Sequence, residues 1–322
     1  MTFKAPPSTL NVLVAGGAGF VGAHLVRALR SLNHRVMVID NQLTGDFHAL
    51  DGISVEIVDG DVTRELDLVG LGQFHVVVHL ASPASPKDYT AYPVETWRAN
   101  SVGTENLLSL CAQTGARFVF ASTSEVYGDP LVHPQSEEYR GNVDPTGPRA
   151  MYDESKRFGE MLVSQYRELF EVKAAIVRIF NAYGPGMRLN DGRVVPSFVS
   201  NALAGHDLVV NGDGTQTRSM TYITDLISAL VLIVQDPASD GLMLNIGSTE
   251  EITMRNLAEL VLGISGSPAG IIEGPARPDE PQQRRPDVSR IYARYRWAAT
   301  VPFEVGLKRT IEWARTKEAV GA

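Results

Sequence analysis

The sequence predicts an α/β protein with a doubly wound parallel sheet, followed by a smaller C-terminal domain. Short apolar runs alternate with helical patterns over about the first 180 residues, which is typical of a parallel sheet covered by helices on both faces. A glycine-rich turn follows the first apolar run. Beyond Phe180 the sequence becomes rich in turn residues, which indicates a change of architecture.

The first unit of this sheet carries a glycine motif. Residues 11–15 form an apolar run that predicts a buried strand, and helical spacing follows over residues 23–32. Gly16, Gly19 and Gly22 lie between them. They permit a tight turn, a close approach of the backbone to a pyrophosphate, and close packing of helix on strand. The helix N-terminus would attract the phosphates.

An acidic residue completes the motif. Residues 35–39 predict a second strand, and Asp40 follows it, 18 residues after Gly22. A carboxylate at this place accepts hydrogen bonds from the adenosine ribose and repels a 2′-phosphate, which favours NAD over NADP. The sequence therefore predicts a Rossmann-type unit that binds NAD.

Four further strands extend the sheet, and long helical patterns connect them. The strands are predicted at 54–58, 75–80, 117–121 and 172–179, and the helices at 93–111 and 151–170. Asp61 and Val62 follow the third strand, where they either border the adenine or belong to a polar loop. His75 and His79 have no acidic or thiol neighbour of metal-ligand spacing, so we interpret them as structural and predict no metal site. Two prolines predict an extended loop over 81–86.

The second half of the chain is less regular. Helices are predicted at 194–203, at 222–235 after a Thr224-Asp225 cap, and at 303–317. Strands are predicted at 208–210 and 241–246, and a long loop at 275–286.

Groups that handle protons converge where the fifth strand ends. Thr123, Ser124 and Glu125 follow that strand, and Tyr152 and Lys156 lie four residues apart on one face of the next helix. Free tyrosine has a pKa of about 10, and a nearby ammonium lowers it toward the range of a useful base. We expect Tyr152 to act as the base and Lys156 as its electrostatic partner.

Composition narrows the classes of partner. The net charge of −8 argues against general nucleic-acid binding, no apolar run is long enough to span a membrane, and the N-terminus does not resemble a signal peptide. The single cysteine, Cys111, lies in an apolar helical pattern and suggests a reducing, cytoplasmic compartment.

The motifs together resemble a known family. Gly16-x-x-Gly19-x-x-Gly22, Tyr152-x-x-x-Lys156 and Asn181-x-Tyr183-Gly184-Pro185 are similar to the extended short-chain dehydrogenase/reductases that act on sugar nucleotides. Within that family the chain is most similar to the UDP-glucuronate decarboxylases, also called UDP-xylose synthases. The stretches that carry this likeness are 79–86, 122–130, 152–157, 191–195, 216–219 and 284–287.

The resemblance implies NAD-dependent decarboxylation of UDP-glucuronate: oxidation at C4, loss of C6 as CO2, and reduction at C4 to UDP-xylose or release of UDP-4-keto-xylose. Relatives that dehydrate a 6-hydroxymethyl sugar have an Asp after the Thr, whereas this chain has Ser124, which leaves room for a C6 carboxylate. Thr123 would bind O4. Glu125 and Arg284 would orient the carboxylate and manage the proton that replaces CO2, although Arg285 is an alternative to Arg284.

The resemblance also implies the remaining site residues and the assembly. Further cofactor-binding residues are Phe20, Val21, Asn41, Thr44, Gly45, Leu80, Ala81, Ser82 and Ala99. Further substrate-binding residues are Pro83, Arg98, Asn181, Arg188, Arg193, Val195 and Arg218. Residues 1–180 with about 219–246 would bind NAD, and about 181–218 with 247–322 the sugar nucleotide. A homodimer would form through a four-helix bundle made by 93–111 and 151–170.

Two alternatives remain open. One is another sugar-nucleotide enzyme, either a 4-epimerase or a 4,6-dehydratase, and the other is a non-catalytic NAD-binding scaffold. The family's usual Cys and Gly are replaced by Met151 and Ser155 beside the tyrosine, which leaves open whether the enzyme completes the reduction.

Overall fold

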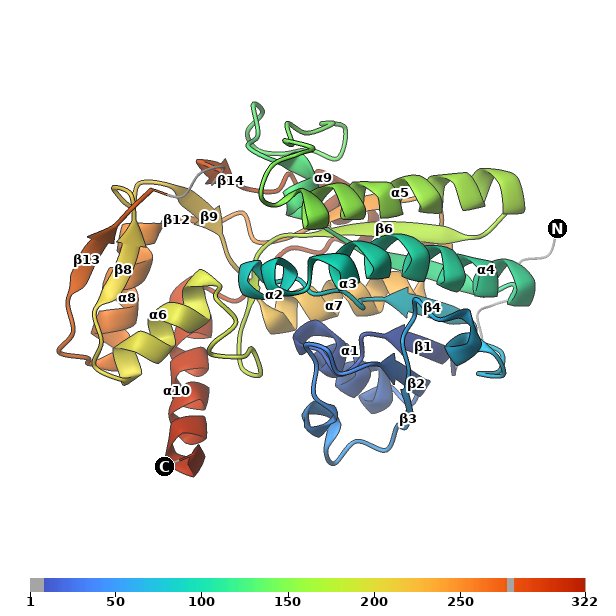
Figure 1. Ribbon diagram of the computed structural model, residues 1–322, viewed down its shortest axis with the longest axis horizontal. Coiled ribbons are helices and arrows are strands. Elements are labelled where there is room, and N and C mark those ends of the chain that lie inside the picture. The colour runs from blue at the N-terminus through green and yellow to red at the C-terminus, as the bar shows by residue number, and fades with distance from the viewer. Residues whose placement is uncertain (1–8, 277–280, 322) are drawn as a thin grey trace.

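The computed structural model describes residues 9–276 and 281–321, and its centre is a seven-stranded sheet (Figure 1). The strand order is β11-β6-β5-β4-β1-β2-β3, and every pairing is parallel. These strands are β1 (Asn11–Ala15), β2 (Arg35–Asp40), β3 (Glu56–Asp59), β4 (Val76–His79), β5 (Arg117–Thr123), β6 (Ala174–Ile179) and β11 (Met243–Ile246). The predicted Rossmann-type sheet is confirmed.

Helices cover both faces of the sheet, because successive strand residues point to opposite sides. Val12 and Val14 of β1 pack with α1 (Phe20–Ser31) and α7 (Ile223–Gln235). Leu13 and Ala15 belong to a separate apolar cluster, which contains residues of α4 (Thr104–Thr114) and α5 (Ala150–Phe170). In Figure 1, α4 and α5 lie on one side of the sheet and α1 lies on the other.

The helix predicted at 93–111 is interrupted. It consists of α3 (Pro93–Arg98), a π-helical turn η3 (Ala99–Gly103) and α4, which runs on to Thr114. A π-helical turn holds one extra residue in the ladder, and nothing in the apolar spacing of the sequence reveals it.

Two local predictions are wrong. Residues 81–86 do not form an extended loop throughout, because Pro86 begins the short helix α2 (Pro86–Ala91), where proline at the first helical position is well tolerated. Ser85 caps this helix. Nor does Thr224-Asp225 cap α7, which begins at Ile223. The Asp225 carboxylate instead accepts hydrogen bonds from the backbone N–H groups of Thr300 and Val301.

The remaining elements gather at one end of the molecule, on the left of Figure 1. They include α6 (Val194–Leu203), β8 (Leu208–Asn211), α8 (Met254–Ser265), β13 (Ile271–Gly274) and α10 (Phe303–Gly321). Small sheets join β10 (Thr221–Tyr222) to β7 (Ala182–Tyr183), and β9 (Thr217–Ser219) to both β12 (Glu251–Thr253) and β14 (Gln283–Arg284). Helix α9 (Ser289–Tyr295) and the 3₁₀ turns η1 (Phe47–Leu50), η2 (Glu65–Leu68) and η5 (Pro237–Ser239) complete the chain.

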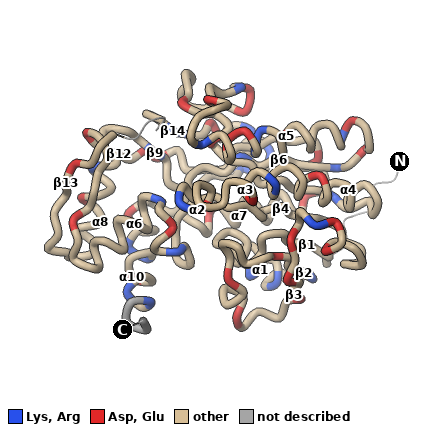
Figure 2. Tube along the Cα trace, in the orientation of Figure 1, with Lys and Arg blue, Asp and Glu red and all other residues tan. Residues whose placement is uncertain are grey.

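Some predictions concern residues that are not described. Residues 1–8 of the N-terminus, which we predicted not to be a signal peptide, lie outside the described residues. Residues 277–280 of the predicted loop at 275–286 lie outside them too, and β14 lies within the rest of that loop. Lys, Arg, Asp and Glu are interspersed along the trace (Figure 2). Within residues 9–276 and 281–321, no helix has the length and apolar character to cross a membrane.

Candidate active site

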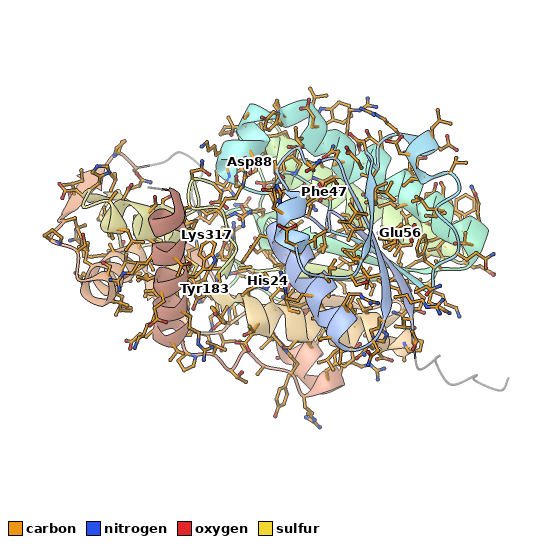
Figure 3. The ribbon with its side chains drawn as sticks, turned by 90° about the horizontal axis from the view of Figure 1, so that it is seen from below. His24, Phe47, Glu56, Asp88, Tyr183 and Lys317 are labelled. Atoms are coloured by element: carbon orange, nitrogen blue, oxygen red, sulfur yellow. The ribbon has the colours of Figure 1, made fainter. Side chains whose placement is uncertain are left out.

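A cavity of about 1250 Å³ lies where the strands of the sheet end, between the sheet and the group of elements around α6 and α10. Figure 3 looks toward it from below, with His24 of α1 on one side and Lys317 of α10 on the other. The glycine-rich turn, the end of β5, the start of α5 and residues of β14 all contribute to its wall. The position matches the general rule that ligands bind at the carboxyl ends of parallel strands.

The glycine-rich turn fits a dinucleotide. Gly16 has a φ of +81°, and a Cβ there would lie 2.5 Å from the Ala81 nitrogen. At Gly22 a Cβ would lie 2.1 Å from the Gly16 carbonyl oxygen, so a side chain is excluded. No side chain caps the helix at Gly19, and the first N–H groups of α1 are therefore available to a phosphate.

The acidic residue of the motif is built into the turn. Asp40 ends β2, and its carboxylate accepts hydrogen bonds of 2.9 Å from the backbone N–H groups of Ala18 and Gln42. Burial raises the pKa of Asp40, and the two N–H groups oppose that rise. The Asn41 amide donates to the Asp61 carboxylate at 3.0 Å.

Some predicted cofactor residues line the cavity and others do not. Lining residues are Gly16, Gly19, Phe20, Val21, Gly22, Thr44, Gly45, Leu80 and Ser82. Asp40, Asn41, Asp61, Val62, Ala81 and Ala99 are not among the lining residues. Val62 packs instead in the apolar cluster under α4, and the Ala99 carbonyl lies 3.2 Å from Nε2 of His79.

The proton-handling groups are brought together as predicted from their spacing. β5 runs two residues further than expected, to Thr123, which caps the 3₁₀ turn η4 (Ser124–Tyr127) and accepts from the Glu125 N–H at 3.2 Å. Tyr152 and Lys156 project from α5 and are buried. The Tyr152 ring stacks on Tyr89 of α2, with centroids 5.2 Å apart and planes at 14°.

The two groups on α5 have shifted pKa values. Burial raises the pKa of Tyr152, although a hydrogen bond with Thr123 and the charge of Arg193 lower it. Burial lowers the pKa of Lys156 to about 7, while Glu160 acts in the opposite sense. The Lys156 ammonium donates to the Ala121 carbonyl at 2.7 Å. The Lys156 nitrogen lies 5.9 Å from the centroid of the Tyr152 ring, and the net effect of the surroundings is still to raise the pKa of Tyr152.

Glu125 is held between two guanidinium groups. It forms ion pairs with Arg149, just before α5, and with Arg284 of β14. Burial alone would raise the pKa of Glu125, but Arg284 and Arg149 hold it below its usual value. Arg284 is 2% exposed and also donates to the Gly128 carbonyl at 2.9 Å. Arg285 instead points to Glu251, so Arg284 is the arginine at the cavity.

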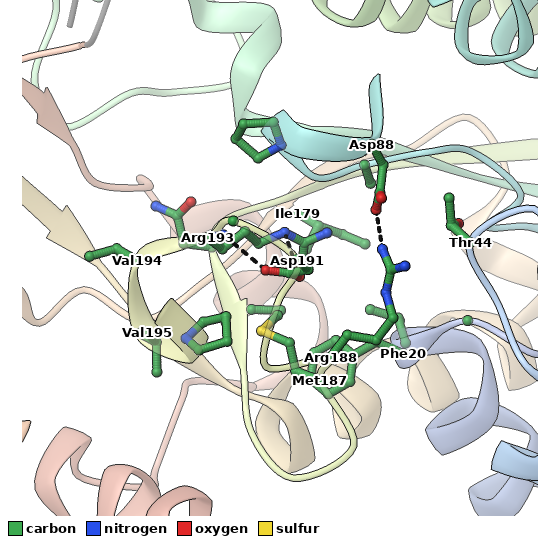
Figure 4. A pocket seen from close by; sticks show the side chains of 18 of the residues that line it. Phe20, Thr44, Asp88, Ile179, Met187, Arg188, Asp191, Arg193, Val194 and Val195 are labelled. Atoms are coloured by element: carbon green, nitrogen blue, oxygen red, sulfur yellow. Dashed lines mark hydrogen bonds and ion pairs between the residues drawn. The ribbon is translucent and has the colours of Figure 1, made fainter. Parts of the chain in front are cut away.

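Two of the predicted substrate arginines, Arg188 and Arg193, pair with acidic neighbours (Figure 4). Arg188 pairs with Asp88 of α2, and the Arg193 side chain lies 3.5 Å from the Asp191 carboxylate. Arg218 is buried and donates to the Thr217 carbonyl at 2.8 Å. The cavity is lined by Arg188, Arg193, Arg218, Asn181 and Val195.

Three positions lie away from the expected place. Pro83 and Arg98 do not line the cavity; Arg98 is exposed, and its guanidinium lies over the Trp97 ring at 5.8 Å. Ser155 does not line it either, because its hydroxyl faces the π-helical turn, where it accepts from the Asn100 amide at 3.0 Å and donates to the Met151 carbonyl.

Several site residues were missed. Tyr89 and Asp88 belong to the unexpected helix α2, and the Ser85-Pro86 pair at its start was the available signal. Arg149 could have been noted from its spacing of four to Asp153. Asp191, which orients Arg193, lies in the stretch 191–195 that carries the family likeness, but it was not predicted as a site residue.

The buried histidine of β4 was expected to be structural. His79 is 1% exposed and packs beside Phe118 and Phe120. Burial and the charge of Lys156 lower the pKa of His79 to about 3. Over the part of the chain that the structure describes, no group of three His, Cys, Asp or Glu residues could hold a metal ion.

Comparisons with known proteins agree with this geometry. Residues 12–247 match the model of the NAD dependent epimerase/dehydratase family. The chain is 42% identical to UDP-glucuronic acid decarboxylase 1 of Danio rerio, over 97% of this chain and 74% of that protein. A UDP-glucose 4-epimerase structure from Thermotoga maritima superposes with a TM-score of 0.89 at 27% identity, over 96% and 99% of the two chains. MoeE5, solved with UDP-glucuronic acid and NAD, has a TM-score of 0.82 at 28% identity, over 95% and 99%.

Proposed function

Because this chain belongs to the NAD dependent epimerase/dehydratase family, we propose that it is an enzyme that decarboxylates UDP-glucuronate with the help of NAD. Named relatives at 40–42% identity are UDP-glucuronic acid decarboxylases, and the cavity carries an arrangement that suits a carboxylated sugar. The observation that carries the proposal is Glu125, clamped by Arg149 and Arg284 beside Ser124, where a dehydratase would place an aspartate.

The cofactor would occupy the glycine-rich end of the cavity. The first turn of α1 would hold the pyrophosphate, and Asp40 would accept from the ribose. When bound, NAD supplies the acceptor for the C4 hydride and later its donor. Lys156, at the adjoining wall, is within the same buried cluster as Tyr152 and would bind the nicotinamide ribose as the family resemblance implies.

Tyr152 is the proposed base for the O4 proton, and Thr123 its hydrogen-bonding partner. A neutral tyrosine has to lose its proton for this task, and burial makes that loss harder. The positive charges of Arg193, of protonated Lys156 and of the oxidised nicotinamide oppose that effect. Stacking on Tyr89 keeps the Tyr152 ring in place for the transfer.

Oxidation would make C4 a ketone β to the C6 carboxylate. The C5–C6 bond can then break, CO2 leaves, and the electron pair moves to the C4 oxygen as an enolate. Arg284 is the proposed partner of the C6 carboxylate, with Glu125 fixing its orientation. Arg188, Arg193 and Arg218 are the proposed ligands of the diphosphate, so Arg188 would exchange Asp88 for substrate.

Completion of the reduction would give UDP-xylose, and early release would give UDP-4-keto-xylose. Ser155 and Met151 do not line the cavity, which favours UDP-xylose, because their departure from the family pattern does not reach the substrate. In the proposed domain arrangement, residues 1–180 with about 219–246 bind the cofactor. Residues about 181–218 with 247–322 bind the sugar nucleotide.

We also propose a homodimer in a cytoplasmic compartment. The helices α3 and α5 lie side by side and leave large apolar side chains exposed, which would be buried by a second copy in a four-helix bundle. These side chains are Val94, Trp97, Phe158, Met161, Leu169 and Phe170. Light scattering after size exclusion tests the proposed dimer, and a monomer at micromolar concentration contradicts it.

The proposed reducing compartment rests on the buried, unpaired Cys111.

One incubation tests the activity. The protein is mixed with UDP-glucuronate and NAD, CO2 is trapped, and the nucleotide product is identified by NMR. The expected result is CO2 with UDP-xylose. Conversion of UDP-glucose without CO2 from UDP-glucuronate would instead identify a 4-epimerase or dehydratase, and no conversion of either would identify a scaffold.

A further inference from the structure

A second cavity, of about 480 Å³, lies behind the ion-paired cluster of the active site. Glu125, Arg149 and Arg284 line both cavities, so the cluster stands between them. The other walls of the second cavity are mainly polar and include Asp129, Asn142, Asp144 and Gln282. Such a lining suits water rather than an apolar ligand.

One buried carboxyl group of this second cavity has no role in the reaction described so far. Asp153 follows Tyr152 on α5 and is 6% exposed. Its Oδ2 lies 3.9 Å from Nε of Arg149, and no described residue donates a hydrogen bond to its Oδ1. A buried carboxyl oxygen without a partner is costly when ionised, unless water reaches it or the group carries a proton.

Asp153 and Glu125 compete for the same arginine on unequal terms. Glu125 contacts both Arg149 and Arg284 directly, so it stays ionised. Burial and the negative charges of Glu125 and Glu154 raise the pKa of Asp153. The positive charges of Arg149 and Arg284 lower it, and the resulting pKa is about 7. At neutral pH, Asp153 is thus the carboxyl group of this pair that is partly protonated, whereas Glu125 is ionised.

The proposed reaction needs a proton at this place. After CO2 leaves, C5 of the enolate must gain a proton, and the ionised Glu125 has none to give. Tyr152 has taken the O4 proton and faces the oxidised C4. A separate proton source on the carboxylate side of the sugar is therefore required.

We propose that Asp153 is this proton source and that the second cavity is the route by which water restores its proton. The inference rests on the proposed decarboxylation. The C5–C6 bond breaks, CO2 leaves with the former C6, and the bond's electron pair forms the enolate. A new C5–H bond forms with a proton that Asp153 passes through water beside Glu125. Asp153 then regains a proton from the second cavity, so one proton is consumed for each CO2.

The test compares Asp153→Asn with Glu154→Gln, which changes a half-exposed neighbouring carboxylate on the same helix. The wild-type protein must first release CO2 from UDP-glucuronate, since failure there refutes the proposed function and not this inference. Asp153→Asn is then expected to lower kcat about 100-fold or more, with KM within about 3-fold. Reduced cofactor forms at a near-normal rate in a stopped flow and accumulates, because the step after C4 oxidation is slowed. Glu154→Gln turns over at close to the wild-type rate, and its fall in kcat lies at slightly lower pH, because Glu154 is the weakest of the named charges that act on the pKa of Asp153.

Two further readouts separate proton supply from packing. The wild-type kcat falls as pH rises above about 7, because the protonated form of Asp153 is depleted; this fall is lost in Asp153→Asn, and Asp153→Glu restores part of the rate. Infrared titration of the protein shows a protonated carboxyl band near neutral pH that Asp153→Asn lacks. A near-wild-type kcat in Asp153→Asn, or equal slowing of cofactor reduction and turnover, overturns the inference.

Discussion

Replacing Glu125 by Gln tests the ion-paired cluster at the centre of the site. The amide keeps the shape of the side chain but removes the charge shared by Arg149 and Arg284. The amide oxygen can accept from only one of the two guanidinium groups, and the amide NH2 faces the other as a second donor. One hydrogen bond between charged groups, which contributes about 1.5–3 kcal/mol, is therefore lost. Two buried guanidinium groups are also left without a carboxylate, and we expect a total loss of about 2–4 kcal/mol in the free energy of unfolding at pH 7.

The pH dependence of this loss has a defined sign. The two arginines depress the folded-state pKa of Glu125, so its contribution to stability is present above its unfolded pKa, near 4.3, and is lost as pH falls through the folded value. Urea denaturation of the wild-type protein and the variant at pH 7 and at about pH 3.5 measures the difference in their free energies of unfolding at each pH. This difference is expected to be smaller at the lower pH.

The same variant has a kinetic signature. Because Tyr152, Thr123 and Lys156 are untouched, C4 oxidation is expected to persist, while CO2 release falls about 100-fold. Glu154→Gln, which breaks a half-exposed pair with Arg157, is the control and changes stability by less than about 0.5 kcal/mol. A stability difference that is the same at both pH values, or a variant as stable as the wild type, refutes the reasoning.

Three other substitutions probe separate parts of the site. Tyr152→Phe removes one hydroxyl and leaves the stacked ring, so kcat is expected to fall about 1000-fold in the CO2 assay while the melting temperature moves by only a few degrees. Arg188→Ala removes a proposed diphosphate ligand that now pairs with Asp88, and steady-state kinetics should give a KM raised about tenfold with kcat little changed. Gly22→Ala puts a methyl group against the Gly16 carbonyl, and calorimetric titration should detect no NAD binding; wild-type affinity would contradict this account of the turn.

Local sequence signals predicted the parts of the fold that local forces decide. The strand at 11–15 and the helix at 194–203 have the predicted bounds, because apolar spacing is a property of each segment alone. The small sheet of β12, β9 and β14 was not predicted, because its pairing joins residues such as Arg218 and Arg284 that lie far apart in the chain. The predicted cap of α7 was wrong for a similar reason, because the Asp225 carboxylate accepts its hydrogen bonds from residues near position 300, far away in the sequence.

The site shows the same division. Thr123, Tyr152 and Lys156 were predictable because a strand end and a helix face bring them together within about 35 residues. Arg284 was expected only by resemblance, because no local pattern says that a residue so distant in sequence reaches Glu125. Arg149 was missed, since a lone arginine before a helix has many ordinary uses.

The short helix α2 connects parts of the protein that are usually considered separately. In three consecutive residues, Lys87 donates to the Asn190 carbonyl, Asp88 pairs with Arg188, and Tyr89 stacks on Tyr152. Segments about 100 residues apart are thereby tied to one six-residue element. An engineer who grafts the loop around Arg188 from a relative to alter substrate choice should therefore transplant α2 with it. A loop and an α2 helix from different proteins would not fit each other, and the misfit would also disturb the ring of Tyr152.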